Sequence, residues 1–151
     1  MTPESRPPFD LWSLTDLQTP WCIHVAVTLD IPAFTATEPR TIDQIAHHSA
    51  SDPGMLTSVL RHLVAKGVFI EPEKGLFELS PAAMALAEPA ARLGLDLNGI
   101  GGRMACAWET LLPAVRSGKS AYADRFGLPF WEDLEAHPEI AAQFDEMIGP
   151  S

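Results

Sequence analysis

Apolar side chains near the start of the chain recur every three or four positions, the spacing that places them on one face of a helix. The stripe consists of Leu11, Leu14, Leu17, Trp21, Val25 and Leu29. Thr19 and Pro20 lie inside it, as a helix N-cap followed by proline at the first helical position. The pattern therefore predicts two short helices, over residues 10–17 and 20–29.

Capping residues mark two further helices in the middle of the chain. Thr41 stands where it can cap a helix over residues 42–49. Asp52 and Pro53 repeat the combination of cap and proline, and a longer apolar stripe follows them. Gly67 ends this second helix at the position that favours a left-handed residue.

A hairpin and a third helix complete this middle region. Two β-rich runs, at residues 68–70 and 76–79, are separated by turn residues and predict a hairpin. Ser80 then precedes a proline and begins a helix that reaches residue 87. Helix, turn, helix, hairpin and helix in this order are typical of a winged-helix core, which the sequence predicts over residues 41–87.

The last third of the chain begins with a glycine-rich stretch at residues 88–102. A long amphipathic helix follows from Met104, with Gly118 at its end and Pro113 inside it as the cause of a bend. A final helix is predicted over residues 138–148, where apolar side chains again lie one turn apart.

Together these patterns predict a mainly α fold with a winged-helix core of three helices and a β-hairpin, flanked by helices at both ends. A disordered tail is expected at residues 1–10 because of its prolines. N-terminal helices occupy residues 11–40, with a connector at their end. A linker and further helices occupy residues 88–148.

Composition and charge exclude several classes of protein. The chain has 151 residues, a formal net charge of −10 and a pI near 4.7. It would repel a nucleic acid, because affinity for nucleic acids comes mostly from Lys and Arg on phosphates. No apolar run approaches the ~18 residues of a membrane span, and no secretory signal begins the chain. Cys22 and Cys106 are predicted to be buried reduced thiols, so we expect a cytoplasmic protein without membrane contact.

A winged helix first suggests DNA binding through the solvent face of its second helix. That face is predicted to carry Thr57, Ser58, Arg61, His62, Ala65 and Lys66. Residues 40–80, however, contain four bases against five acids, and the hairpin carries three glutamates against one lysine. This charge is of the wrong sign for contact with phosphates, so DNA binding is the weaker interpretation.

Other candidate chemistry has a simpler structural explanation in each case. The glycines of residues 99–102 lack the preceding strand of a nucleotide-binding turn, so we interpret them as a flexible joint. Adjacent histidines on a helix point about 100° apart, which argues against metal binding by His47, His48 and His62. Four neighbouring acids are interpreted as a solvated helix face rather than as catalytic carboxylates: Glu132, Asp133, Glu135 and Glu139. No nucleophile with an adjacent base is found.

Large apolar side chains are more numerous than a winged-helix core of this size can bury. The surplus comprises Leu11, Leu14, Trp21, Met104, Trp108, Trp131, Ile140, Phe144 and Ile148. Stripes at opposite ends of the chain imply a second surface, which a twin subunit and a hydrophobic ligand would cover. The alternative is that both ends pack on each other within one monomer.

Four segments resemble a known family in their order and spacing. They are PWCIHVAVTLDI at residues 20–31, TIDQIA at 41–46, LRHLVAKGVF at 60–69 and GLFELS at 75–80. Single positions follow at similar intervals, namely Trp108, Gly118, Phe126, Gly127, Phe130, Trp131, His137, Pro138 and Phe144. Taken together, residues 11–148 resemble the N-terminal region of small-molecule O-methyltransferases that depend on S-adenosylmethionine, of the plant phenolic and bacterial polyketide or anthracycline type.

The resemblance implies a dimerisation domain built on a winged helix, which exchanges N-terminal helices with a second subunit and forms a wall of the acceptor pocket. It implies dimer contacts by Leu11, Leu14, Leu17, Trp21 and Val25. It implies that the pocket wall for an aromatic, polyketide-like acceptor includes Asn98, Met104, Ile140, Phe144 and Ile148.

The family's Rossmann-like catalytic domain, with its cofactor loop and catalytic histidine, has no counterpart in these residues. We therefore expect no catalytic, cofactor-binding or metal-binding residue in this stretch, and S-adenosylmethionine is implied only for a catalytic domain outside it. Enzymatic activity is expected of the stretch only as part of a complete methyltransferase. Two alternatives remain: a free-standing relative that binds a ligand or a partner methyltransferase, and a winged-helix transcription regulator.

Overall fold

The computed structural model describes residues 9–149. The tail predicted over residues 1–10 lies outside the described residues, apart from Phe9 and Asp10, which belong to no helix or strand. A single 3-10 turn at Ser13–Thr15 replaces the first predicted helix. The Asp10 side chain accepts the backbone N–H of Trp12 at 3.1 Å, and such local bonds compete with helix formation.

The second predicted helix is present as α1, Gln18–Thr28. Two residues after its end, Asp30 has a left-handed backbone (φ 60°) that turns the chain into a short helix, α2 (Ile31–Thr35). The connector predicted at the end of residues 11–40 is therefore shortened by this helix, which reaches Thr35. Helix α2 forms because burial of Ile31 and Pro32 against the core stabilises a segment too short to be helical on its own.

Helices α3 (Ile42–Ser49) and α4 (Pro53–Ala65) confirm the predicted caps. The Thr41 hydroxyl accepts the backbone N–H of Gln44, and the Gln44 side chain accepts the backbone N–H of Thr41. Asp52 accepts the backbone N–H of Met55 at 2.8 Å. Gly67 has a φ of 80° where α4 ends.

Strands β2 (Phe69–Glu73) and β3 (Leu76–Leu79) form the predicted hairpin, although β2 is longer than expected. A two-residue strand, β1 (Arg40–Thr41), pairs antiparallel with β3, so the sheet has the order β1-β3-β2. The winged-helix core lies between this sheet and the helices. Its buried apolar side chains include Ile31, Ile45, Leu56, Leu60, Leu63, Phe69, Phe77 and Leu79.

After the sheet the chain leaves this core through a 3-10 helix, η2 (Pro81–Ala87), and helix α5 (Pro89–Leu95). The predicted long helix is divided into α6 (Ile100–Ala107), a 3-10 turn at Trp108–Thr110 and α7 (Leu111–Ser117). Pro113 causes the division, because it has no N–H to donate to the carbonyl four residues earlier.

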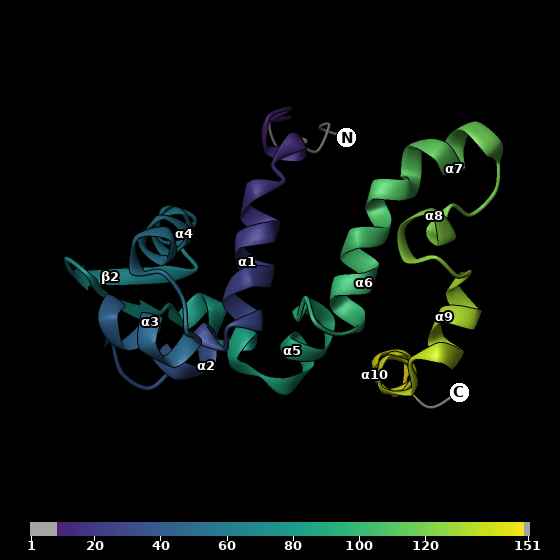
Figure 1. The fold of residues 1–151 in the computed structure, drawn as a ribbon. Coiled ribbons are helices and arrows are strands. Elements are labelled where there is room, and N and C mark those ends of the chain that lie inside the picture. Colours follow the sequence, from purple (N-terminus) through teal and green to yellow (C-terminus); the bar gives the residue numbers. More distant parts are fainter. Residues whose placement is uncertain (1–8, 150–151) are drawn as a thin grey trace, which may run out of the picture.

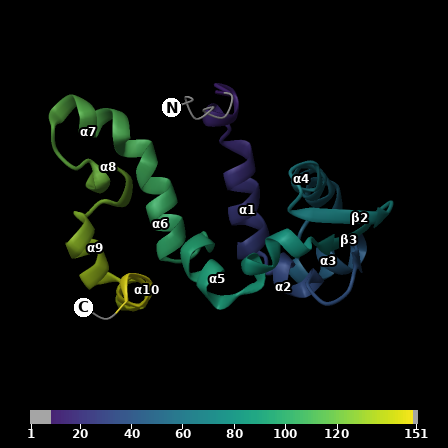
Figure 2. The same ribbon diagram turned by 180° about the vertical axis from the view of Figure 1, so that it is seen from behind.

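Helices α8 (Tyr122–Phe126), α9 (Phe130–Ala136) and α10 (Pro138–Ile148) complete the chain. They pack with α6 around a second, smaller core, whose buried members are Ile100, Leu134 and Ile140. We call residues 89–149 the distal half. Figures 1 and 2 show the winged-helix core on one side and the distal half on the other, joined through α5, which lies below the upright helices α1 and α6.

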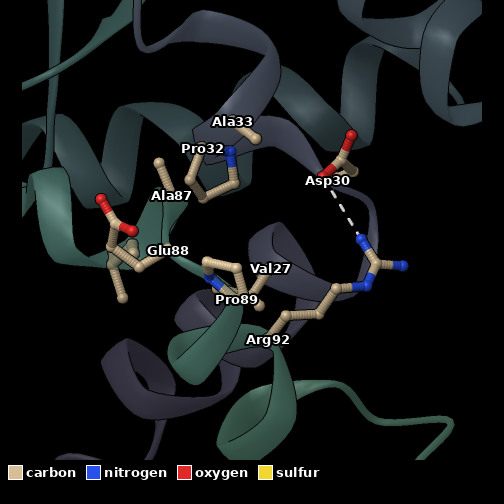
Figure 3. A pocket seen from close by; sticks show the side chains of 9 residues that line it. Val27, Asp30, Pro32, Ala33, Ala87, Glu88, Pro89 and Arg92 are labelled. Carbon is tan, nitrogen blue, oxygen red and sulfur yellow. Dashed lines mark hydrogen bonds and ion pairs between the residues drawn. The ribbon is translucent and has the colours of Figure 1, made fainter.

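A pocket of about 230 Å³ marks the joint between the two halves. Figure 3 shows Pro32 and Pro89 at this pocket and the ion pair between Asp30 and Arg92, whose atoms are 3.2 Å apart. His48 approaches the same carboxylate at 3.3 Å. Asp30, between α1 and α2, thus contacts side chains of both α3 and α5.

The glycines at the start of α6 are not the flexible joint predicted from the sequence. Gly101 and Gly102 are buried, and the Gly102 amide donates to the carbonyl of Asp96 at 2.9 Å. A Cβ on Gly102 would fall on the carbonyl oxygen of Leu97, with the Leu97 Cα 2.6 Å away. The absence of a side chain permits this tight backbone contact, which fixes the start of α6 against residues 96–97.

Candidate functional site

An apolar surface lies exposed at the N-terminal end of the described chain. Four of the five residues predicted at the dimer contact are exposed there, and Leu17 is 73% exposed; the four are Leu11, Leu14, Leu17 and Trp21. Trp12, which the apolar stripe did not include, is 79% exposed and belongs to the same segment. Val25 is half-buried. We call residues Leu11–Trp21 the N-terminal apolar surface.

A second apolar surface lies on α6, α7 and the turn between them. Its exposed side chains are Met104, Trp108, Leu111, Leu112 and Val115, which we call the distal apolar surface. Met104 and Trp108 also line an open hollow of about 260 Å³. The alternative in which the two ends bury each other within one monomer is wrong, because α1 packs on α4 and α5 while α10 packs on α5, α6 and α9.

The five residues predicted to line an acceptor pocket are divided among several places. Asn98 and Ile140 line one hollow of about 280 Å³, at the start of α6, beside α8 and the start of α10. Met104 belongs to the distal apolar surface instead. Phe144 packs edge-to-face against Phe130, and Ile148 is exposed on the last turn of α10. We call the hollow that contains Asn98 and Ile140 the α6–α10 hollow.

Asp133 lies at the centre of a buried polar network that the sequence interpretation missed. The sequence pattern groups it with the solvated acids, but it is only 1% exposed. Its carboxylate accepts the Tyr122 hydroxyl at 2.6 Å and pairs with an Arg103 guanidinium nitrogen at 3.1 Å. The prediction was wrong because α9 turns this one acid inward, away from the exposed Glu132 and Glu135.

His137 extends the network, and its tautomer follows from its neighbours. Its Nδ1 lies 2.8 Å from the carbonyl oxygen of Asp133 and 3.1 Å from a carboxylate oxygen of the same residue. Both oxygens accept, so Nδ1 carries a proton. Asp133 of α9 therefore links Arg103 of α6 and Tyr122 of α8 to His137, which lies between α9 and α10. Asp133 and His137 are four residues apart, about one helical turn, and this spacing was the sequence signal that could have indicated their contact.

Burial, followed by the hydrogen bond to Asp133, raises the pKa of Tyr122 to about 12. Because the folded pKa lies above the ordinary value of 10.0, the stabilisation is complete below about pH 10 and is lost as the pH rises through about 12. Tyr122 is the only tyrosine in the chain, so tyrosinate absorbance reports it alone. We expect a titration midpoint near 12 in the folded protein and near 10 in denaturant. A folded midpoint near 10 would contradict the network.

The histidines and cysteines have structural surroundings. His48 stacks on Phe34 with ring centroids 4.0 Å apart, and His62 contacts the Thr19 hydroxyl at 2.8 Å. Within residues 9–149 no three His, Cys, Asp or Glu side chains are grouped as metal ligands would be. Cys22 and Cys106 are unpaired and half-buried rather than fully buried. Burial, with a smaller effect from Asp16, raises the pKa of the Cys22 thiol.

The face that would read DNA in a winged helix is occupied by an internal ion pair. Arg61 of α4 contacts Glu71 of β2, with the closest nitrogen and oxygen 2.9 Å apart. Glu71 also accepts the backbone N–H of Gly75 at 2.9 Å, so the Arg61 side chain is linked to the hairpin.

The described residues include no helix with the length and apolarity that a membrane crossing requires.

Comparison with known sequences gives relatives along most of the chain, although no family model matches it. It is 36% identical over 141 residues to a 2,7-dihydroxy-5-methyl-1-naphthoate 7-O-methyltransferase from Streptomyces carzinostaticus. That match covers 91% of this chain and 42% of the relative. It is 38% identical over 143 residues to an aclacinomycin 10-hydroxylase from Streptomyces purpurascens, with 91% and 38% covered. The chain thus spans about two fifths of these relatives.

Solved structures agree with the sequence relatives. An O-methyltransferase from neocarzinostatin biosynthesis, in complex with S-adenosylmethionine and 2-hydroxy-5-methyl naphthoic acid, superimposes with a TM-score of 0.85 at 34% identity. The match covers 95% of this chain and 45% of that one. By sequence and by fold, the chain belongs to the small-molecule O-methyltransferases dependent on S-adenosylmethionine.

Proposed function

We propose that this chain is the dimerisation and acceptor-wall region of an S-adenosylmethionine-dependent O-methyltransferase that acts on an aromatic, polyketide-like small molecule. In this proposal the chain pairs with a second copy by exchange of N-terminal helices. It also presents part of the wall against which the acceptor lies. The cofactor belongs to a catalytic domain outside this stretch, and the whole enzyme is cytoplasmic.

The observation that carries the proposal is the exposure of two large apolar surfaces. Monomeric soluble proteins rarely expose contiguous apolar patches of this kind, and such patches mark interfaces or ligand sites. Trp12 and Trp108 are 79% and 72% exposed, although tryptophan is among the side chains that gain most from burial. A twin subunit and an acceptor would together cover the two surfaces.

The names of the relatives support an aromatic acceptor. One relative is named for a dihydroxynaphthoate, and one solved structure contains a naphthoic acid. Further relatives include a phenazine O-methyltransferase from Lysobacter antibioticus, 31% identical over 126 residues. Planar aromatic acceptors recur among these proteins, which is why we propose that class here.

A second candidate reaction is hydroxylation, and one observation favours it. The relative with 38% identity is named a hydroxylase rather than a methyltransferase. In this alternative the same region serves an enzyme that hydroxylates an aromatic polyketide. A free-standing ligand-binding relative is the further alternative, whereas transcription regulation is disfavoured by the Arg61–Glu71 pair and by the net charge.

Pairing of two copies is tested by a charge placed within the N-terminal apolar surface. Leu14 and Leu17 are 68% and 73% exposed, so Leu14→Glu or Leu17→Glu should leave the monomer fold intact. In a dimer each glutamate would be buried without a partner, so we expect the dissociation constant to rise by about 100-fold or more. Light scattering at micromolar concentration measures the mass.

The matched control is Met55→Glu on α4, which is equally exposed at 69% but lies outside both apolar surfaces. This variant should remain as dimeric as the original chain. A monomeric mass for the unchanged chain, or equal weakening by the control, would overturn pairing through the N-terminal apolar surface.

A further inference from the structure

Residues 10–15 carry much of the N-terminal apolar surface, yet they make no hydrogen bond to a distant part of the described chain. Their side-chain hydrogen bonds, such as those from the backbone of Trp12 and Ser13 to Asp10, all stay within the segment. The 3-10 turn at Ser13–Thr15 contains no buried residue, and Figure 1 shows it, in purple, at the upper end of α1. The direction in which this segment points therefore depends on its junction with α1.

That junction lies at Asp16, where the backbone is extended (ψ 110°) between the 3-10 turn and α1. The Asp16 carboxylate accepts two hydrogen bonds from Thr19 in the first turn of α1, one from the backbone N–H at 3.1 Å and one from the hydroxyl at 2.5 Å. These hydrogen bonds, the one from the hydroxyl foremost, lower the pKa of Asp16. The carboxylate is therefore ionised at neutral pH and acts only as an acceptor.

A third side chain connects this junction to the winged-helix core. The Nε2 atom of His62, in α4, lies 2.8 Å from the Thr19 hydroxyl oxygen. The single hydroxyl proton is donated to Asp16, so the oxygen accepts from His62 and Nε2 carries a proton. All three residues are half-buried, so water competes less for these hydrogen bonds than at an exposed site. We call Asp16, Thr19 and His62 the α1 anchor.

His62 occupies a face of α4 that a DNA-binding winged helix would turn toward bases. The sequence predicts Arg61 and Lys66 on the same face. In the structure, however, Arg61 pairs with Glu71 of the hairpin, and His62 contacts the start of α1. Both side chains are thus engaged within the chain, and His62 is engaged with the helix that continues the N-terminal apolar surface.

We propose that the α1 anchor directs the N-terminal apolar surface toward the second copy of the chain and so strengthens the pairing of two copies. This inference rests on the proposed pairing and adds the polar residues that orient the paired surface. A segment that is held in one direction before pairing loses less conformational freedom when it pairs. Without the anchor, residues 10–15 would rotate about Asp16 and would have to be ordered during association, at a cost in free energy.

Two pairs of variants separate the hydrogen bonds of the anchor from the volume of its side chains. Thr19→Val and His62→Leu abolish the hydrogen bond between the two residues, whereas Thr19→Ser keeps a hydroxyl and His62→Gln keeps an N–H donor. We expect each of the first two to raise the dimer dissociation constant at least about five-fold, and each of the second two to change it less than about two-fold. Dilution of the full chain, followed by light scattering, measures the constant. His47→Leu, at an exposed position of α3, is the matched control and should leave it unchanged.

The outcomes distinguish this inference from the function on which it rests. If the anchor were merely structural, a single copy and a pair would lose the same hydrogen bonds, and the dissociation constants of Thr19→Val and His62→Leu would equal that of the unchanged chain. That result, with Leu17→Glu still disruptive, would overturn this inference and leave the proposed pairing in place. Equal weakening by Thr19→Ser and Thr19→Val would also overturn it, since side-chain volume and not the hydroxyl would then be responsible. A monomeric mass of the unchanged chain would contradict the pairing itself, and this inference with it.

Discussion

Gly102→Ala is expected to destabilise the distal half by about 3 kcal/mol or more, because overpacking against rigid backbone exceeds the usual cost of an added methyl group. The new Cβ would overlap the carbonyl oxygen of Leu97 and lie 2.6 Å from its Cα. No side chain can rotate away to relieve this overlap. The start of α6 must therefore separate from residues 95–97.

Gly94→Ala is the control for Gly102→Ala. Gly94 lies in α5, where an added Cβ would meet no atom within 4 Å, and alanine forms helices better than glycine by about 1 kcal/mol. We expect this variant to be as stable as the original chain or more so. Denaturant unfolding, followed by circular dichroism, measures both. Equal stability of the two variants would show that the tight contact at Gly102 does not exist.

Asp133→Ala is the second large effect that we expect. Removal of one partner from a buried ion pair costs about 3–5 kcal/mol, because the other charge remains buried without compensation. Here the abandoned groups are the Arg103 guanidinium, which is 19% exposed, and the Tyr122 hydroxyl. Glu135→Ala, at an exposed position of the same helix, should change the unfolding free energy by no more than about 0.5 kcal/mol.

A double variant separates the charge from the packing. Arg103→Met combined with Asp133→Leu removes both charges and keeps the volume, so it should recover most of the stability that Asp133→Ala loses. Denaturant unfolding of the single and double variants gives the coupling free energy. No coupling between the two positions would mean that the pair contributes nothing, and that the distal half depends on its small apolar core alone.

Much of the winged-helix core could be predicted, because its signals are local. Thr41, Asp52 and Gly67 each act on backbone groups within a few residues, so their caps are legible without knowledge of the fold. The hairpin has the same property. These elements appear in the structure close to their predicted bounds.

Short elements that depend on distant partners could not be predicted in the same way. Strand β1 exists only because Arg40 pairs with Phe77, far along the chain. Helices α2 and α5 are five and seven residues long, below the length at which a helix is stable alone. Their formation follows from packing against the core and against α1, which the hydrophobic pattern does not encode.

In the candidate site, too, some features follow from local sequence patterns and others depend on contacts between distant elements. Exposure of the N-terminal apolar surface follows from counting apolar residues, and the structure agrees for Leu11, Leu14, Leu17 and Trp21. Nothing in the sequence pattern, however, distinguished the buried Asp133 from its exposed acidic neighbours. Which of several neighbouring charges turns inward depends on contacts between α6, α8 and α9.

The two separate cores have a consequence for how the chain responds to a partner. The apolar core cluster of the distal half contains three buried residues, against ten in the winged-helix core, so local opening should begin in the distal half. Whatever covers that half raises its stability by mass action. Recognition and ordering of these helices then form one equilibrium, in which a bound partner and the folded distal half stabilise each other.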